Sequence, residues 1–503
     1  MVMMHRWNDQ GRRKLGSDNI DALIGRALSN HRNNQVDEAE RLYNQVLVLD
    51  PLNADALHLK GAIAIHRGDY RRAVDLISRA IVERPDQAAF YSNLAVALQK
   101  LGMVDKAQIY AERALQLKID SAEPYVVLGQ SSLASGQTDA ALEKFKVALK
   151  LQPDNPAAER GILDALNQSG QLERVESFIE ERLRQPAVRD ELFIKLAHVK
   201  TRLGKPDEAV IALDKCKHQA GHDWHVQAMK AKIDLKRFDE ARTHGQEVLA
   251  IKDKLAALVA EDIDVAAIQR RWSGTLRPFD PTSPHRNIVC FSLWGDDQKY
   301  TYTAVLNAKL ISSVYPGWKA RFYIDSTVPS EIAQALRDYG AQVILVQNDG
   351  RTFLKLFWRF LAASDLSIDY FLCRDCDAVV NHREKAAVDE WLASGKPFHI
   401  MRDHPEHAEL IMAGMWGGAA GLLPNLAEEA VRYYETHETK WRWVDQDFLR
   451  DRVWSVIKDH TVTHDSQYLF GSDARPFPAG SELPEGDHVG GYHPVTWKVR
   501  QGA

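Results

Sequence analysis

Two aspartates separated by one residue, Asp375 and Asp377, are the strongest candidates for chemistry in this sequence. They follow the apolar run SIDYFLCR, which has the composition of a buried β-strand. Alternate residues of a strand point to the same side, so the two carboxylates are expected to face one point. Like charges at one point resist joint ionisation unless a cation lies between them. The pair predicts a Mg²⁺ or Mn²⁺ site, and the alternative is an acidic turn that caps the next helix.

Other residues around this pair could act on a nucleotide diphosphate. Neutralisation of a leaving diphosphate requires cations, and we assign this role to the metal with Arg359 or Arg374. Gly414 would let the backbone approach a sugar closely. The tryptophans Trp416, Trp441 and Trp443 could exclude water. The nucleotide base or ribose is expected to contact the end of an earlier strand, at Ser292, Leu293, Trp294 and Gly295.

A second polar group, Asp445-Gln446-Asp447, lies further along the chain. We predict that it forms the catalytic side of the site, with Asp445 and Gln446 orienting the acceptor. Asp445 could be the general base of an inverting reaction or could orient groups in a retaining one.

Cys373 and Cys376 form a single C-x-x-C without a second pair, so we predict buried packing residues rather than a zinc or redox site.

The elements that must position these residues alternate between strand and helix from Asn287 onwards. Strands are predicted over 287–295, 319–325, 341–347 and 367–377, with helices over 299–315, 329–340 and 351–365. This alternation indicates a mostly parallel α/β sheet covered on both faces. Ligands bind beyond the carboxyl ends of such strands, which is where Asp375 and Asp377 are expected.

The strand-helix alternation with D-x-D after an apolar strand resembles the Rossmann-like GT-A fold of nucleotide-sugar glycosyltransferases, over roughly His285 to Phe477. Asp445 to Leu449 resembles the D-Q-D-x-L element of family 8 transferases, and Arg359 stands where their donor-binding basic residue lies. Several stretches also resemble a group of bacterial transferase-like domains. The resemblance implies hexosyltransferase activity with a nucleotide-sugar donor, a UDP-sugar first, and a third metal ligand at His488, with His493 as the alternative.

The first half of the chain repeats every 34 residues. Small residues recur in phase at Ala39, Ala73, Ala107 and Ala141, and glycines recur at the turns. This period is the signature of tetratricopeptide repeats, in which stacked helix pairs bury a continuous core. We count about seven repeats, and Ala241 arrives two residues early, which predicts one shortened helix. We expect the groove that binds a protein acceptor or partner to be lined by His58, Ile65, Ser92, Asn93, Gln99, Val126 and Gln130.

The predicted organisation is a tail (1–19), tetratricopeptide repeats (20–257), a helix and linker (258–286) and a GT-A-like domain (287–503). The formal net charge of -5 divides into +1 before His285 and -6 after it. No basic surface suits nucleic acid, and no apolar run predicts a membrane span or a signal peptide, so we expect a cytoplasmic protein. The alternative function is a non-enzymatic scaffold with a degenerate transferase-like domain.

Overall fold

The computed structural model describes residues 19–185, 189–216, 218, 221–272, 276–347, 350–423, 425–437 and 441–491. The chain divides into two compact units, residues 1–181 and 182–503. This division lies inside the predicted repeats rather than at 257/258, because the last repeat helices pack with the α/β region. Within the residues described, no helix has both the length and the apolar character needed to cross a membrane.

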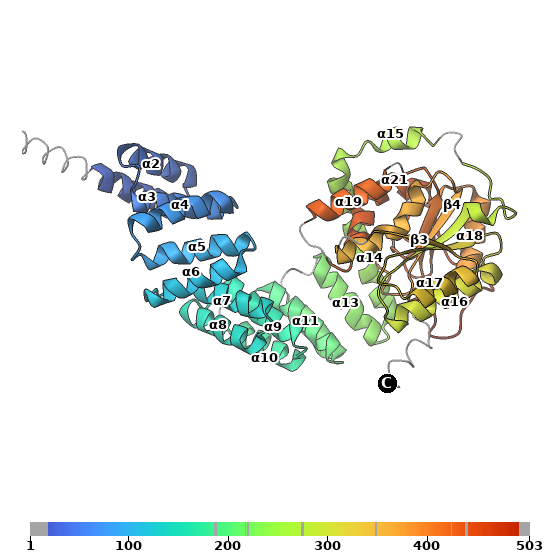
Figure 1. Ribbon diagram of the computed structural model, residues 1–503. Coiled ribbons are helices and arrows are strands. Elements are labelled where there is room, and N and C mark those ends of the chain that lie inside the picture. The colour runs from blue at the N-terminus through green and yellow to red at the C-terminus, as the bar shows by residue number, and fades with distance from the viewer. Residues whose placement is uncertain are drawn as a thin grey trace, which may run out of the picture. The chain divides into compact units, whose positions relative to one another are not determined.

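The first unit consists of antiparallel helices (Figure 1). The in-phase alanines are completely buried, so neighbouring helices approach closely. The turn glycines Gly68, Gly102, Gly136 and Gly170 all have positive φ, which confirms their predicted role. After a helix over 19–32, the helices are α2 (Val36–Leu49), α3 (Ala54–His66), α4 (Tyr70–Glu83), α5 (Ala88–Lys100), α6 (Val104–Gln116), α7 (Glu123–Ala134), α8 (Thr138–Leu151), α9 (Pro156–Gln168) and α10 (Leu172–Leu183).

The second unit begins with four more helices of the same pattern, α11 (Asp190–Arg202), α12 (Pro206–Asp214), α13 (His222–Asp234) and α14 (Phe238–Val259). Helix α12 has 9 residues against 12 to 14 in the helices before it, which confirms the predicted shortening. Helix α14 packs directly on the α/β region. A side chain at Gly245 would collide with Tyr468, and Lys252 Nζ donates to the carbonyl of Ala408 at 2.9 Å.

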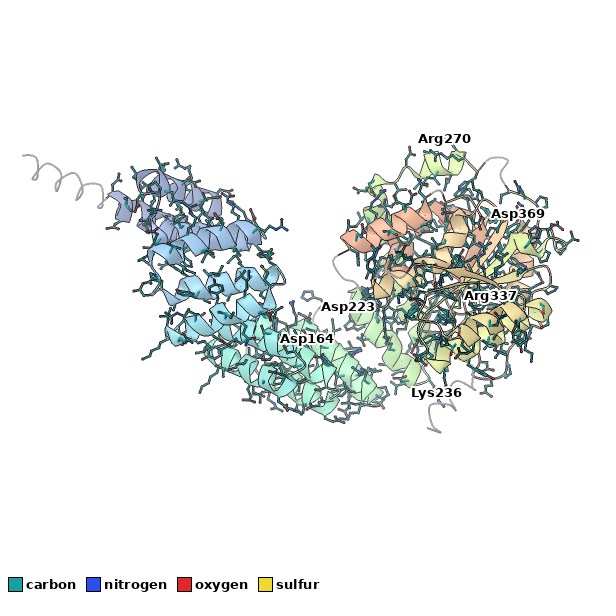
Figure 2. All side chains as sticks on the ribbon, in the orientation of Figure 1. Asp164, Asp223, Lys236, Arg270, Arg337 and Asp369 are labelled. Atoms are coloured by element: carbon teal, nitrogen blue, oxygen red, sulfur yellow. The ribbon has the colours of Figure 1, made fainter. Side chains whose placement is uncertain are left out.

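The segment predicted as a linker is attached to the α/β region by several of its described residues. It contains η1 (Ala260–Asp262), α15 (Val265–Arg270) and η2 (Pro284–Arg286). Trp272 Nε1 donates to the carbonyl of Leu422 at 2.7 Å. Asp369, labelled in Figure 2, accepts from Arg286 at 2.6 Å and from Arg277 at 3.1 Å. These contacts fix the chain that leads into the first strand.

The α/β region contains one eight-stranded sheet with the order β3-β2-β1-β4-β6-β5-β7-β8. Strand β6 runs antiparallel to β4 and β5, and the other pairs are parallel, so the sheet is mixed. The strands are β1 (Asn287–Leu293), β2 (Lys319–Ile324), β3 (Gln342–Leu345), β4 (Tyr370–Arg374), β5 (Phe398–Arg402), β6 (Trp416–Ala419), β7 (Thr461–Asp465) and β8 (Ala474–Arg475).

Helices cover both faces of this sheet (Figure 1). The predicted helix at 351–365 forms as the 3₁₀ helix η3, which packs on β1 and β4. The predicted helices at 299–315 and 329–340 form as α16 and α17. The remaining elements are α16 (Gln298–Val314), α17 (Ser330–Asp338), η3 (Thr352–Ser364), α18 (His382–Ser394), α19 (Leu426–Thr436), α20 (Val444–Phe448), η4 (Leu449–Trp454), α21 (Ser455–Ile457) and η5 (Lys458–His460).

Candidate functional site

The side chain of Arg359 joins two of the predicted site segments. It extends from η3, and its Nη2 donates to Asp445 Oδ2 at 2.7 Å while its Nη1 bonds Asp375. Asp445 lies in α20, 86 residues away in sequence, and is buried. Burial raises the pKa of Asp445 to about 6, against the opposing effect of the Arg359 guanidinium. Three residues that the sequence singled out separately therefore meet at one point.

The second aspartate of the D-x-D pair has a different cationic partner. Lys299 Nζ donates to Asp377 Oδ2 at 2.7 Å. Lys299 lies in the first turn of α16, whose N-terminus is capped by Asp297. Burial and the negative charge of Asp375 raise the pKa of Asp377, so the two carboxylates do influence one another. The sequence analysis missed Lys299, and its position at the start of the predicted helix that follows β1 was the available signal.

The end of β1 lies against this cluster. Ser292 Oγ accepts from the backbone N–H of Arg359 at 2.9 Å, so β1 helps to fix the arginine. Leu293 is a buried core residue. The ring of Trp294 packs edge-on against Trp358, with 6.4 Å between ring centroids. Gly295 has a positive φ, and its N–H donates to Thr327 Oγ1 at 2.8 Å.

Arg374 lies elsewhere, which corrects the prediction that it binds the donor. Strand alternation turns it away from Cys373, which faces η3. Its guanidinium is buried, where Nε donates to Glu384 Oε2 at 3.3 Å and Nη2 contacts the hydroxyl of Tyr315 at 3.4 Å. Arg374 therefore forms a buried ion pair with Glu384 of α18. Cys373 and Cys376 are buried with free thiols, as the sequence predicts.

The glycine-rich segment 414–418 forms a turn and a buried strand. A Cβ at Gly414 would lie 1.9 Å from Asp375 Oδ2, so the close approach here is to the aspartate itself. Trp416 is completely buried and packs on Phe371 with 5.1 Å between ring centroids. It is a core residue and does not shield the site. Trp441 and Trp443 are 43% and 42% exposed.

The residues after Asp445 point in different directions. Gln446 Oε1 is buried and has no hydrogen-bond partner among the residues described. The Nε atom of Arg359 is also buried without a hydrogen-bond partner among the residues described. Such unpaired polar atoms are costly inside a protein, and a polar ligand would satisfy them. Asp447 instead accepts from Trp441 Nε1 and from Arg450 Nη1, both at 2.8 Å.

His488 lies in a separate histidine cluster. Ring nitrogens of His488, His404 and His407 lie within 4.8 Å of one another. Among the described residues, this is the one group of three or more such side chains that meets this spacing, and it does not include Asp375 or Asp377. The predicted metal shell of Asp375, Asp377 and His488 is therefore not assembled, because His488 packs beside the loop after β5. The alternative ligand, His493, lies outside the described residues.

The end of β2 carries a further ion pair that the sequence analysis did not single out. Lys355 Nζ, from η3, donates to Asp325 Oδ2 at 2.8 Å, and Asp325 is 1% exposed. Asp325 directly follows β2, as Asp375 follows β4. Acidic residues at the carboxyl ends of β2 and β4 therefore both meet cations of η3.

In the predicted groove of the repeats, three of the seven residues, His58, Ser92 and Val126, are buried. The amide Nδ2 of Asn93 contacts His58 Nε2 at 2.8 Å. Burial lowers the pKa of His58 to about 4. Of the predicted groove residues, His58 is 9% exposed, and the side chains that are half-buried are Ile65, Asn93, Gln99 and Gln130.

Comparison with known proteins identifies the repeats. Residues 24–88, 64–124 and 126–174 match the sequence model of the tetratricopeptide repeat family. The Hsp70-Hsp90 organizing protein of Triticum aestivum is 32% identical over 112 residues, which are 22% of this chain and 19% of that protein. The small glutamine-rich tetratricopeptide repeat-containing protein 2 of Mycosarcoma maydis is 26% identical over 113 residues, 22% of this chain and 32% of that protein.

The chain thus spans between about a fifth and a third of the length of these curated relatives. Among solved structures, a tetratricopeptide repeat protein from Parabacteroides merdae aligns with 46% of this chain and 92% of its own length. The sequence identity is 16% and the TM-score is 0.36. The match to the family model shows that tetratricopeptide repeats form the N-terminal part of the chain, and the mixed sheet follows them.

Proposed function

We propose that the repeats bind a protein segment and that the α/β region is a GT-A-type glycosyltransferase that uses a nucleotide-sugar donor. The first half of this proposal is supported by the match to the tetratricopeptide family and by relatives that include an Hsp70-Hsp90 organizing protein. The second half is supported by the geometry around Arg359. One buried guanidinium bonds both Asp375 and Asp445, beyond the carboxyl ends of β1 and β4.

The proposed reaction breaks the bond between the anomeric carbon of the sugar and the diphosphate. An acceptor hydroxyl forms the new bond to that carbon and gives its proton to a base, and the nucleoside diphosphate leaves with the bonding electrons. Asp445 is the candidate for this base or for the group that orients the sugar. Arg359 and Lys299 are the cations positioned to stabilise the departing diphosphate.

Asp375 and Asp377 would hold the proposed Mn²⁺ or Mg²⁺. Their oxygen atoms suit a hard dication, and such an ion would offset the repulsion between the two carboxylates, which together with burial raises the pKa of Asp377. When bound, such an ion would neutralise the charge that develops on the diphosphate. Binding requires Asp377 to exchange its contact with Lys299 for the metal.

A panel of nucleotide sugars with Mn²⁺, assayed for release of the nucleotide, tests the proposal. We expect turnover with at least one donor and a loss of about 10²–10³-fold in Asp377→Asn, the range found when one charge-stabilising group is removed. Asp389→Asn, in an exposed pair with Lys385, is the matched control and should retain turnover. Failure of every donor to bind or react would exclude the transferase.

The second candidate is a protein-binding scaffold whose α/β region has no catalytic activity. The known relatives favour it, because they match this chain over about a fifth to a third of its length and are tetratricopeptide proteins. The separation of His488 from the D-x-D pair also favours it. Thermal melting with and without Mn²⁺ separates the two functions, because a ligand that binds the folded state raises the midpoint. No shift, together with no turnover, would establish the scaffold.

A further inference from the structure

Three histidines form a cluster that the transfer reaction described above does not use. His404 and His407 lie in the loop after β5, and His488 comes from the C-terminal segment. The ring centroid of His488 lies 4.3 Å from that of His404 and 5.1 Å from that of His407. His407 is buried, whereas the side chains of His404 and His488 are half-buried. The cluster is therefore partly exposed.

Backbone hydrogen bonds determine which nitrogen of each ring carries the proton. His407 Nδ1 lies 3.2 Å from the backbone N–H of Asp403 and 3.1 Å from that of His404. His404 Nδ1 lies 3.2 Å from the N–H of Glu406. A backbone N–H can only donate, so both Nδ1 atoms accept and each neutral ring carries its proton on Nε2.

His488 has the opposite arrangement. Its Nδ1 lies 3.0 Å from the carbonyl oxygen of Val489, which can only accept, so Nδ1 carries the proton and Nε2 is an acceptor. A Cβ at Gly491 would lie 3.3 Å from this Nε2, so the glycine leaves the acceptor uncrowded. The cluster as a whole offers two N–H donors and one acceptor on neutral rings.

This pattern selects among possible ligands. A metal ion needs an unprotonated nitrogen from each ring, and a ligating histidine normally donates its other N–H. Two of the three rings have the reverse arrangement, so a transition metal does not fit. A phosphate dianion fits poorly as well. It would face the lone pair of His488, and the nearby Arg383 is already held by both oxygens of Asp403 at 2.8 Å.

Sugar hydroxyl groups match the cluster, because each hydroxyl both accepts and donates. We propose that His404, His407 and His488 form a binding site for adjacent hydroxyl groups of a neutral saccharide. The saccharide is the acceptor of the transfer reaction, a role that rests on the proposed function. Short contacts connect the two sites. Gly414 lies against Asp375, and a Cβ at Gly490 would lie 2.7 Å from the sulfur of the adjacent Met415.

The arrangement of the loop supports a dedicated site. Asp403 receives both Arg383 bonds and also accepts from the N–H of Val489 at 3.0 Å. This carboxylate therefore holds the segment that carries His488 against the loop that carries His404 and His407. These contacts hold the segments that carry the rings, and the rings also pack on one another, with 4.3 to 5.6 Å between their centroids.

Binding of methyl glycosides of glucose, galactose, mannose and N-acetylglucosamine to the full chain, measured by saturation-transfer NMR and titration, tests this site. We expect at least one glycoside to bind, with affinity reduced at least tenfold in His404→Phe and in His407→Phe. His407→Gln keeps a donor and an acceptor, so it should retain more affinity than His407→Phe. His285→Phe, at an exposed position, is the control.

Two further measurements keep the proposal falsifiable if a variant does not fold. Nitrogen-15 NMR of the wild-type histidines should show protons on Nε2 of His404 and His407 and on Nδ1 of His488. Titrations with ZnCl₂ and with inorganic phosphate should show no binding that depends on these rings. Glycoside binding by none of the probes, or stoichiometric Zn²⁺ or phosphate binding lost in the ring variants, would overturn the site. Ring-dependent glycoside binding without turnover of any nucleotide sugar would preserve the site and exclude the transferase.

Discussion

The repeat helices up to Glu181 and the α/β region from Asn287 bury very different numbers of charges. Among the described residues up to Glu181, Glu159 is the single charged side chain with almost no exposure, and ion pairs such as Arg41–Glu38 lie at the surface. The α/β region buries many more, namely Arg321, Asp325, Lys355, Arg359, Arg374, Glu384, Arg402, Asp403, Asp445, Asp451 and Asp465.

The difference shows what each region needs from its side chains. A buried charge destabilises a protein unless it is paired, so a stack of helices that only needs a core avoids it. The α/β region contains closed pairs, such as Arg402–Asp465, in which both side chains are fully buried. The Arg359 cluster differs because its Asp375 side chain is 46% exposed. An ion-pair cluster that reaches the surface, and not buried charge alone, distinguishes the candidate site.

The largest expected effect concerns a closed pair. Arg402→Met would leave Asp465 buried without its partner, which typically costs 3–5 kcal/mol, so we expect a correspondingly lower free energy of unfolding in denaturant titrations. Arg41→Met, which removes an exposed pair in the repeats, should change stability little. Equal losses in the two variants would contradict the contrast between the regions.

The pH dependence of turnover tests the cluster of Arg359, Asp375 and Asp445, which reaches the surface. Because burial raises the pKa of Asp445 to about 6, kcat/KM should fall about tenfold per pH unit below that value if the ionised carboxylate is needed. Asp445→Asn should be much less active and should lack this limb. The folded state holds this proton more tightly than the unfolded state. The contribution of Asp445 to stability is therefore greatest below its ordinary pKa and decreases as the pH rises to about 6.

Protonation of Asp445 therefore does not destabilise the fold as the pH decreases. A loss of activity at pH 5 cannot be explained by acid unfolding through this residue, and thermal melts at each pH provide the control. A flat rate profile between pH 4.5 and pH 7.5 in a folded enzyme would exclude a catalytic role for the ionised carboxylate.

Lys299→Met tests whether the ammonium group of Lys299 and the proposed metal compete for Asp377. Removal of the ammonium group 2.7 Å from Asp377 should increase Mn²⁺ affinity about tenfold, because the metal then displaces no competing charge. Paramagnetic resonance of free Mn²⁺ measures this affinity. Lys385→Met, which removes a lysine paired with Asp389, is the matched control. Weaker metal binding in Lys299→Met would show that the lysine supports the site instead.

The smallest expected effect lies in the repeats. Gly136 has a φ of 73° and open space around it, so Gly136→Ala adds only conformational strain of roughly 1–2 kcal/mol. We expect a modest decrease in the melting temperature of the repeats and unchanged nucleotide release. Gly25→Ala, inside a helix and also in open space, should be stabilising. A loss of turnover in Gly136→Ala would contradict a division of labour between the regions.

Local patterns predicted much of the fold. The 34-residue period identified the repeats, their turn glycines and the shortened α12, because each repeat places equivalent residues in equivalent contacts. The first four strands and the helices between them also follow from periodicity, which depends on neighbours in the sequence. Asp375 directly follows a strand, as the sequence predicts, but β4 ends at Arg374, so strand alternation does not orient the pair of carboxylates. The attachment of α14 and the linker to the sheet was not predictable, since it depends on Tyr468, Leu422 and Asp369 far along the chain.

The sequence by itself determined which elements form and which residues end a strand. Tertiary structure alone decided which side chains meet. It paired Asp377 with Lys299 across 78 residues, buried Arg374 against Glu384, and placed His488 beside His404 and His407. The physical reason is that backbone periodicity is a local property, whereas a site forms where segments distant in sequence pack together. Whether a charged side chain becomes part of a core or of a site depends on that packing.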